Sequence, residues 1–380
     1  MRVRTRSLQL FALMPVLAAF GAAFLFFIGH DALEGRHPFQ FFADSNTYHE
    51  IYAGDHVSAD NALLSVASNY LGPLTMLELA QGNIYLVMLL NTAIFTLSML
   101  KISSLLNIDP LKAALIILLS PLTISSLLSV NKEIFIFPFF ACALAAYAHR
   151  SFAAMLTALV LSVVVRWQFT LFYVVLVLIC AMPRMTNRRT TVLVLLAAVS
   201  AAYALMQVAL QPVISAAEAS FESYDGVGSG LFELTIQYQD RGLYWLVFPL
   251  KAAHLLFGMG LRLQDMLQPV EIYNDLIVGL HSAIALVTCA LLAWRGQLTL
   301  RSDLLFASAI FLAIFCLSPI FAPRYLYAAY VAAALVVAGA PMHIRDVRLP
   351  GRARKRVGLA EGTRPTAQTE QSGWLHTPNA

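Results

Sequence analysis

Long apolar runs separated by short polar segments dominate the chain. The first run covers residues 8–28, and similar runs recur as far as residue 340. About 20 apolar residues are enough to cross a bilayer as a helix. The pattern predicts ten membrane spans, near residues 8–28, 84–100, 111–130, 134–148, 152–165, 169–182, 191–210, 276–294, 304–321 and 326–340.

The predicted fold class is an all-α, polytopic membrane bundle of about ten full spans, within a range of ten to twelve. A further apolar piece, 243–259, is interrupted by Lys251, and we expect a re-entrant or interfacial helix there. Hydrophobic residues make up 59% of the chain and charged residues only 12%, whereas a soluble domain carries about 25% charged residues. The run 8–28 exceeds the apolar core of a signal peptide, about 7–15 residues, so we expect a retained signal-anchor helix.

Basic residues predict the orientation of this bundle, because Lys and Arg favour cytoplasmic loops. With the N-terminus inside and 243–259 not crossing, all but seven of the 25 Lys and Arg residues lie on the cytoplasmic side. The seven on the outer side are Arg36, Lys132, Arg166, Arg241, Lys251, Arg262 and Arg324. The outer side also carries most carboxylates and two long loops, 29–83 and 211–275, so we expect the working surface there.

Residues 1–340 therefore form the predicted membrane domain. The tail, 341–380, begins with a basic stretch and becomes rich in polar residues. Such a segment is typical of a solvated cytoplasmic tail that lies on anionic lipid and ends in disorder.

Charged residues at membrane depth mark the candidate site. In "SVNKEIFIFPFF", Lys132 and Glu133 lie at the tip of a predicted hairpin, and the 15-residue run that follows spans only about 22 Å of a hydrocarbon core near 30 Å. In "VVVRWQFTLF", Arg166 interrupts a long apolar run whose two ends are both basic. The sequence predicts two short helices there, with "RWQ" at an outward tip.

Short helices with charged tips predict a wet vestibule below the outer membrane surface. Lys251 and Arg324 have the same setting. Two simpler interpretations stay open. In the first, Lys132 and Glu133 only cap a hairpin in the headgroup layer. In the second, Arg166 and Arg324 extend to lipid phosphates beside aromatic neighbours.

The segment "FFADSNTYHEIYAGDH", residues 41–56, gathers titratable groups next to the first span. Asp44 is a candidate general base. It is also a candidate N-cap of an amphipathic surface helix, with Thr47 and Glu50 completing a capping box. Divalent metal binding stays open but has no compact ligand motif; the residues concerned are His30, His37, His49, His56, Asp44, Asp55 and Asp60. No cofactor is firmly predicted, and all four cysteines lie in apolar runs.

Loose motifs over residues 8–340 resemble the multi-spanning glycosyltransferases of the GT-C type and the related O-antigen or exopolysaccharide polymerases. They are "ADSNTYHEIY", "NYLGPL", the "NKE" hairpin, the "RWQ" tip and a late "PRYLY". The chain departs from that family in two respects: Asp44-Ser45 stands where the family frequently has two acidic residues, and the first outer loop is short.

The resemblance implies transfer of sugar from a polyprenyl phosphate or diphosphate to a glycan or lipid acceptor at the outer face of a bacterial inner membrane, with both termini cytoplasmic. Other envelope polysaccharide assembly proteins are candidate partners; nucleic acid is not. A carboxylate base and cations at the leaving phosphate suit this reaction. The expected residues are Asp44 and Glu133 as catalytic groups, Arg324, Arg166, Lys132 and Lys251 at the phosphate, and Tyr48, Tyr52, Trp167, Gln168, Tyr325, Tyr244 and Trp245 at the sugar or lipid.

Two other classes of function stay open. A transporter or flippase of lipid-linked sugars also needs charges inside a bundle, and paired broken spans or inverted repeats would favour it. A non-catalytic membrane assembly subunit is the third alternative. Substitution of Asp44 or Arg324 would then change abundance but not product.

Overall fold

The structure is a computed structural model that describes residues 2–28, 43–54, 65–182, 187–222, 230–258, 272–318 and 323–339. Every regular element within these ranges is helical, which confirms the predicted all-α class. The helices are α1 (Arg2–Ile28), α3 (Ala43–Ala53), α4 (Ser65–Ala80), α5 (Ile84–Leu106), α6 (Pro110–Leu118), α7 (Pro121–Leu128), η2 (Lys132–Phe135), α8 (Ile136–His149), α9 (Phe152–Val165), α10 (Trp167–Ala181), α11 (Arg188–Glu222), α12 (Gly230–Asp240), α13 (Tyr244–Phe257), α14 (Ile272–Trp294), α15 (Asp303–Phe315), η5 (Pro323–Leu326) and α16 (Tyr327–Ala338).

Helix length separates the apolar elements into two groups. Within the described ranges, five segments are long and apolar enough to cross a membrane: Ser7–Phe27, Ile84–Leu106, Lys132–His149, Arg188–Leu205 and Ile277–Trp294. The apolar helices α9, α10, α13, α15 and α16 are shorter, at 10–17 residues. The structure thus has the character of a membrane protein, and the ten full crossings stay a prediction.

The predicted span 111–130 is wrong as a single helix. It consists of α6 and α7, which meet at an angle of 94°. Ser120 is extended between them, and Pro121 begins α7, where its missing N–H leaves no hydrogen bond unmade. The Ile117 carbonyl at the break accepts both the Ser120 N–H at 3.1 Å and the Thr123 hydroxyl at 2.7 Å.

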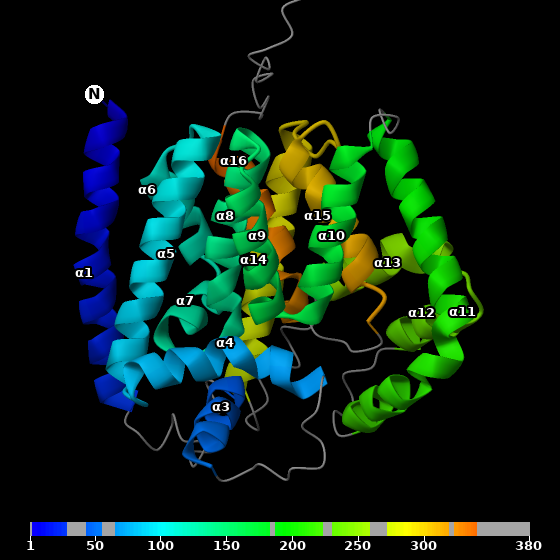
Figure 1. The fold of residues 1–380 in the computed structure, drawn as a ribbon, viewed down its shortest axis with the longest axis horizontal. Coiled ribbons are helices and arrows are strands. Elements are labelled where there is room, and N and C mark those ends of the chain that lie inside the picture. Colours follow the sequence, from blue (N-terminus) through cyan, green and yellow to red (C-terminus); the bar gives the residue numbers. More distant parts are fainter. Residues whose placement is uncertain are drawn as a thin grey trace, which may run out of the picture. The chain divides into compact units, whose positions relative to one another are not determined.

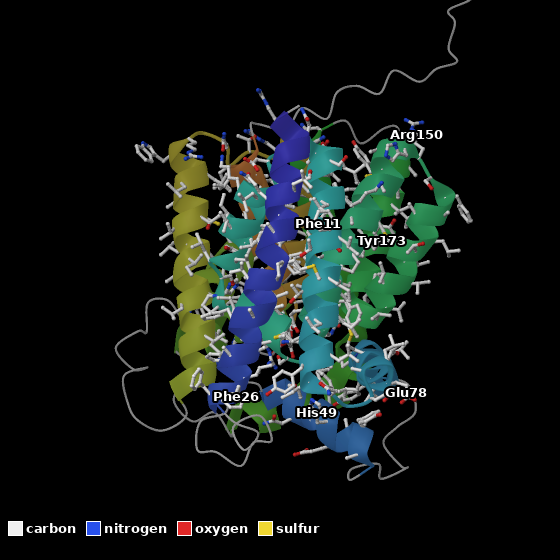
Figure 2. The ribbon with its side chains drawn as sticks, turned by 90° about the vertical axis from the view of Figure 1, so that its left-hand side faces the viewer. Phe11, Phe26, His49, Glu78, Arg150 and Tyr173 are labelled. Carbon is white, nitrogen blue, oxygen red and sulfur yellow. The ribbon has the colours of Figure 1, made fainter. Side chains whose placement is uncertain are left out.

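The long helices run side by side, and α3 and α4 lie across one end of them (Figure 1). Figure 2 places His49 and Glu78 at this end and Arg150 at the opposite end. We call these the α3–α4 end and the Arg150 end. The chain reaches the α3–α4 end with α11 and starts α14 from the same end (Figure 1), so α12 and α13 do not carry it across the bundle. This arrangement is the one predicted for residues 243–259.

The core is centred on α16, all of whose residues are buried. This helix packs against α6, α14 and α15. The outer faces of the bundle carry exposed, large apolar side chains. Phe27, for example, is 84% exposed and Leu205 is 85% exposed. An apolar core inside an apolar rim suits a bundle in lipid, where hydrocarbon replaces water around the outer helices.

The predicted outer loops contain helices of their own. The loop 29–83 includes α3 and α4, and α11 continues to Glu222, beyond the predicted end at residue 210. The tail 341–380 lies outside the described residues.

Candidate functional site

Lys132 and Glu133 lie in η2, at the turn between α7 and α8. The Asn91 amide of α5 donates to the Ser129 carbonyl at 2.9 Å, and Asn131 Oδ1 accepts the backbone N–H of Glu133 at 3.3 Å. Both charged residues are buried against neighbouring helices. Asn91 is absent from the predicted set, although a lone amide in the apolar run 84–100 signals a buried polar contact.

Arg166 separates α9 from α10, as the "RWQ" motif predicts. Its backbone is extended, with φ −173° and ψ 150°. Its N–H still bonds to the Ser162 carbonyl at 3.0 Å, while its own carbonyl accepts from Phe169 at 2.9 Å. The Ser162 hydroxyl donates to that of Thr170 at 3.2 Å across the break. Arg166 is therefore the C-cap of α9 and the N-cap of α10. Because its backbone is extended, its side chain does not follow the direction of either helix's side chains.

The side chains of Arg166 and Glu133 form a buried ion pair. Arg166 Nη2 donates to Glu133 Oε1 at 2.9 Å, and each side chain is only 6% exposed. Two predicted hairpin tips, distant in the sequence, are thus joined by a charge-assisted hydrogen bond. Arg166 does not extend to the lipid surface, which corrects that alternative. Removing either partner would leave an uncompensated buried charge.

Tyr325, in η5, brings a third region of the chain to this pair. The Arg166 guanidinium carbon lies 3.6 Å from the centre of the Tyr325 ring, and that of Arg324 lies 5.8 Å from it. Lys132 adjoins Glu133 in η2. We call Lys132, Glu133, Arg166, Arg324 and Tyr325 the charged cluster. It carries three cationic side chains and one carboxylate, which suits an anionic ligand.

Two buried acceptors beside Arg166 have no hydrogen-bond partner among the described residues. They are Glu133 Oε2 and Gln168 Oε1. Buried polar atoms are nearly always paired, so each of these is a candidate contact for a group that the chain itself does not supply. A hydroxyl-bearing ligand would donate to both.

Helix α4 covers the charged cluster at close range. A Cβ atom placed on Gly72 would lie 2.5 Å from Val164 Cγ1 and 2.9 Å from Phe135 Cε2. These two residues flank Arg166 and Glu133 in the sequence. Glycine in "NYLGPL" is therefore required by close packing, and it fixes the distance between α4 and the two tips.

Helix α3 places Asp44 near the η2 turn through its backbone. The helix is described from Ala43, and Asp44 lies in its first turn. Ser45 and His49 face Ser129 and Val130 across a small cavity of about 10 Å³. The Asp44 side chain lies outside the described residues, and Glu50 is exposed as predicted.

The predicted aromatic contacts divide into core and surface. Tyr48 is 2% exposed and packs edge-on against Tyr70 at 5.6 Å, and Tyr244 is buried with its hydroxyl bonded to the Ala313 carbonyl. Neither presents a face to a sugar as the structure stands. Tyr52 and Trp245 are 39% and 53% exposed, and the side chain of Trp167 lies outside the described residues.

Lys251 belongs to a second polar group. Its Nζ donates to Gln239 Oε1, and Gln239 Nε2 donates to the Leu317 carbonyl at 2.9 Å. Helix α13, which carries Lys251, packs against η5, so this group neighbours the element of Arg324 and Tyr325.

The metal hypothesis gains no ligand set in the described part of the chain, where no three His, Cys, Asp or Glu side chains come together. Of the residues concerned, His30, His37, Asp55, His56 and Asp60 lie outside it. The chain matches no protein-family model, no curated protein and no solved structure.

Proposed function

We propose that this chain is a polytopic membrane glycosyltransferase that acts on a polyprenyl-(di)phosphate-linked sugar. The observation that carries the proposal is the charged cluster, in which Arg166 and Glu133 are paired and buried beside Tyr325 and Arg324. A lipid phosphate has a charged head and an apolar tail, so its site needs cations within a membrane bundle. Unpartnered Glu133 Oε2 and Gln168 Oε1 supply acceptors for sugar hydroxyls.

In the proposed reaction, Asp44 takes the proton from an acceptor hydroxyl as the oxygen attacks the anomeric carbon. The bond from that carbon to the carrier phosphate oxygen breaks, and its electron pair leaves with the phosphate. Arg324, Arg166 and Lys132 stabilise the added negative charge. Glu133 orients Arg166 through Oε1. Ser45, the residue after Asp44 in α3, lines a small cavity together with Ser129 and Val130, which supports this role for Asp44.

The orientation forms part of the proposal. The α3–α4 end faces the extracytoplasmic side of a bacterial inner membrane, and both termini are cytoplasmic. The acceptor is a glycan or lipid of the cell envelope, and other envelope polysaccharide assembly proteins are candidate partners.

The test is to substitute Asp44→Asn, Arg324→Gln and Arg166→Gln singly and to assay lipid-linked glycan or surface polysaccharide. We expect a fall of about 10²-fold or more per variant at matched membrane abundance. Glu50→Gln, exposed on the same α3, is the control. Normal product from all three variants at normal abundance would reject the proposal.

A transporter of lipid-linked sugars is the second candidate, and the break between α6 and α7 favours it. Discontinuous helices carry the substrate site in many transporters. Purified protein in detergent distinguishes the two functions, because glycosyl transfer needs no compartments whereas transport does. Transfer in detergent supports the enzyme, and its absence together with lipid-linked sugar movement in vesicles supports the transporter.

A further inference from the structure

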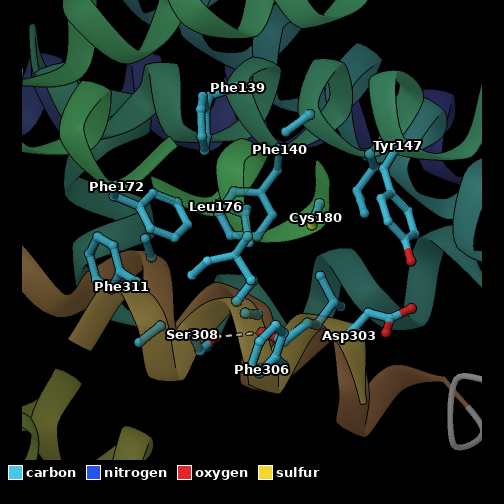
Figure 3. Close-up of a pocket in the computed structure, with 18 of the residues that line it drawn as sticks. Phe139, Phe140, Tyr147, Phe172, Leu176, Cys180, Asp303, Phe306, Ser308 and Phe311 are labelled. Atoms are coloured by element: carbon cyan, nitrogen blue, oxygen red, sulfur yellow. Dashed lines mark hydrogen bonds between the residues drawn. The ribbon is translucent and has the colours of Figure 1, made fainter. Parts of the chain in front are cut away.

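An elongated apolar cavity of about 370 Å³ lies between α8, α10, α15 and α16 (Figure 3). It follows α10 from Phe169 to Met182, which is about 20 Å at the helical rise per residue. Its walls are aromatic and aliphatic, including Phe140, Leu176 and Phe306. The length and lining suit a hydrocarbon chain lying parallel to the helices, and the volume is within the usual range for ligand cavities, about 300–1,000 Å³.

The cavity ends at an ion pair at the Arg150 end. Arg188 Nη2 pairs with Asp303, and both residues line the cavity. Arg188 Nη1 also donates to the carbonyls of Leu300 at 2.9 Å and Arg301 at 2.8 Å. Arg188 thereby ties the turn before α15 to the start of α11.

A basic hollow adjoins the cavity at Arg188. It is open, with a volume of about 1030 Å³, and its lining includes Arg189, Thr299 and Arg301. Arg189 and Arg301 are exposed, and the described residues offer neither of them a carboxylate partner. Since Asp303 is paired with Arg188, the hollow is positively charged.

We propose that this two-part site binds an anionic phospholipid, with its headgroup in the basic hollow and one acyl chain in the apolar cavity. Basic pockets between membrane helices are suited to anionic headgroups. The adjacent apolar cavity favours a ligand that also carries an acyl chain. Free glycerol phosphate, which has none, should therefore bind this two-part site weakly. The basic hollow lies at the end of α10 away from the charged cluster, whereas the apolar cavity extends along α10 as far as Phe169. The proposal does not depend on the proposed transferase activity.

The test is binding of fluorescent phosphatidylglycerol to the full chain in detergent. Arg189→Gln and Arg301→Gln should each weaken binding about fivefold, and the double variant by the product. Ala307→Phe places a ring in the cavity and should also weaken binding. Arg295→Gln, at an exposed arginine outside the hollow, and Ala202→Phe, on the exposed face of α11, are the matched controls and should bind normally.

Competition identifies the occupant. Unlabelled phosphatidylglycerol should displace the probe, whereas phosphatidylcholine with the same chains and glycerol phosphate should not. Equal binding by the wild type and by both the double arginine variant and Ala307→Phe would overturn the proposal. So would displacement by polyprenyl phosphate but not by phosphatidylglycerol, because it would assign the cavity to the carrier chain.

Discussion

The Arg166 guanidinium makes two contacts of different kinds at once. It donates to Glu133 Oε1, and its central carbon lies over the Tyr325 ring. The flat, delocalised charge of arginine suits both contacts, which a lysine ammonium could not reproduce together. Arg166 therefore joins η2, the α9–α10 tip and η5 at one point.

Neutralising one partner of the pair should destabilise the protein more than neutralising both. Arg166→Gln leaves the Glu133 charge buried without a partner, and we expect a loss of about 3–5 kcal/mol. The double variant Arg166→Gln with Glu133→Gln removes that charge and should recover part of the loss. Chemical denaturation in detergent measures each value.

The same pair of variants separates stability from activity. The double variant should regain abundance but make no product, because the cation that faces the proposed phosphate is missing. A wild-type stability for Arg166→Gln would contradict the buried-pair interpretation.

At the scale of elements, the break between α6 and α7 depends on a few side chains. Ser120 Oγ and His281 Nδ1 are hydrogen-bonded at 2.8 Å, and the His281 ring packs edge-on against Tyr327 and Tyr330. Ser120→Ala leaves the buried imidazole nitrogen without its partner, which costs about 1–3 kcal/mol.

Ser126→Ala is the control for this prediction. Ser126 is equally buried, but its hydroxyl donates only to the Leu122 carbonyl of its own helix. Its loss leaves no side chain unpaired. Thermal unfolding should rank Ser120→Ala well below Ser126→Ala, and equal midpoints would show that the bond does not hold the break.

The position of α4 should be sensitive to a single methyl group. Gly72→Ala forces α4 away from Val164 and Phe135, and overpacking of this kind typically costs about 1–3 kcal/mol. Leu71→Ala, next to it and half exposed, is the control. Cysteine cross-linking between α4 and α9 should weaken in Gly72→Ala only; unchanged cross-linking in both would contradict the close contact.

The sequence predicts where helices lie better than how they bend or meet. The two charged tips stand out because Lys132 and Arg166 interrupt apolar runs, and their places as turns are confirmed. The α6–α7 break was missed because proline in an apolar run is compatible with a kink, a break or a helix start. The pairing of Arg166 with Glu133 and the burial of Tyr48 depend on packing between separate segments. The hydrophobic periodicity of the sequence does not indicate which segments pack together.

At the scale of the whole molecule, the arrangement predicts a side for each loop. Residue 298 lies in the turn between α14 and α15, at the Arg150 end of the bundle, which α14 reaches after starting from the α3–α4 end (Figure 1). A topology reporter there should be found on the same side as the N-terminus. A second reporter at residue 54, after α3, should be found on the opposite side. Both reporters on one side would contradict the ten-span topology.

The Arg166–Glu133 pair also bears on the order in which the chain assembles. Each charge alone is costly in hydrocarbon, yet only α8 and α9 separate them in the sequence. They can meet as soon as α8, α9 and α10 have been synthesised, so these two charges can enter the membrane already paired. Tyr325 and Arg324 arrive only with the last helix. The charged cluster can therefore close only once η5 has been synthesised, and a chain stalled before η5 would hold the Arg166–Glu133 pair without Arg324 and Tyr325.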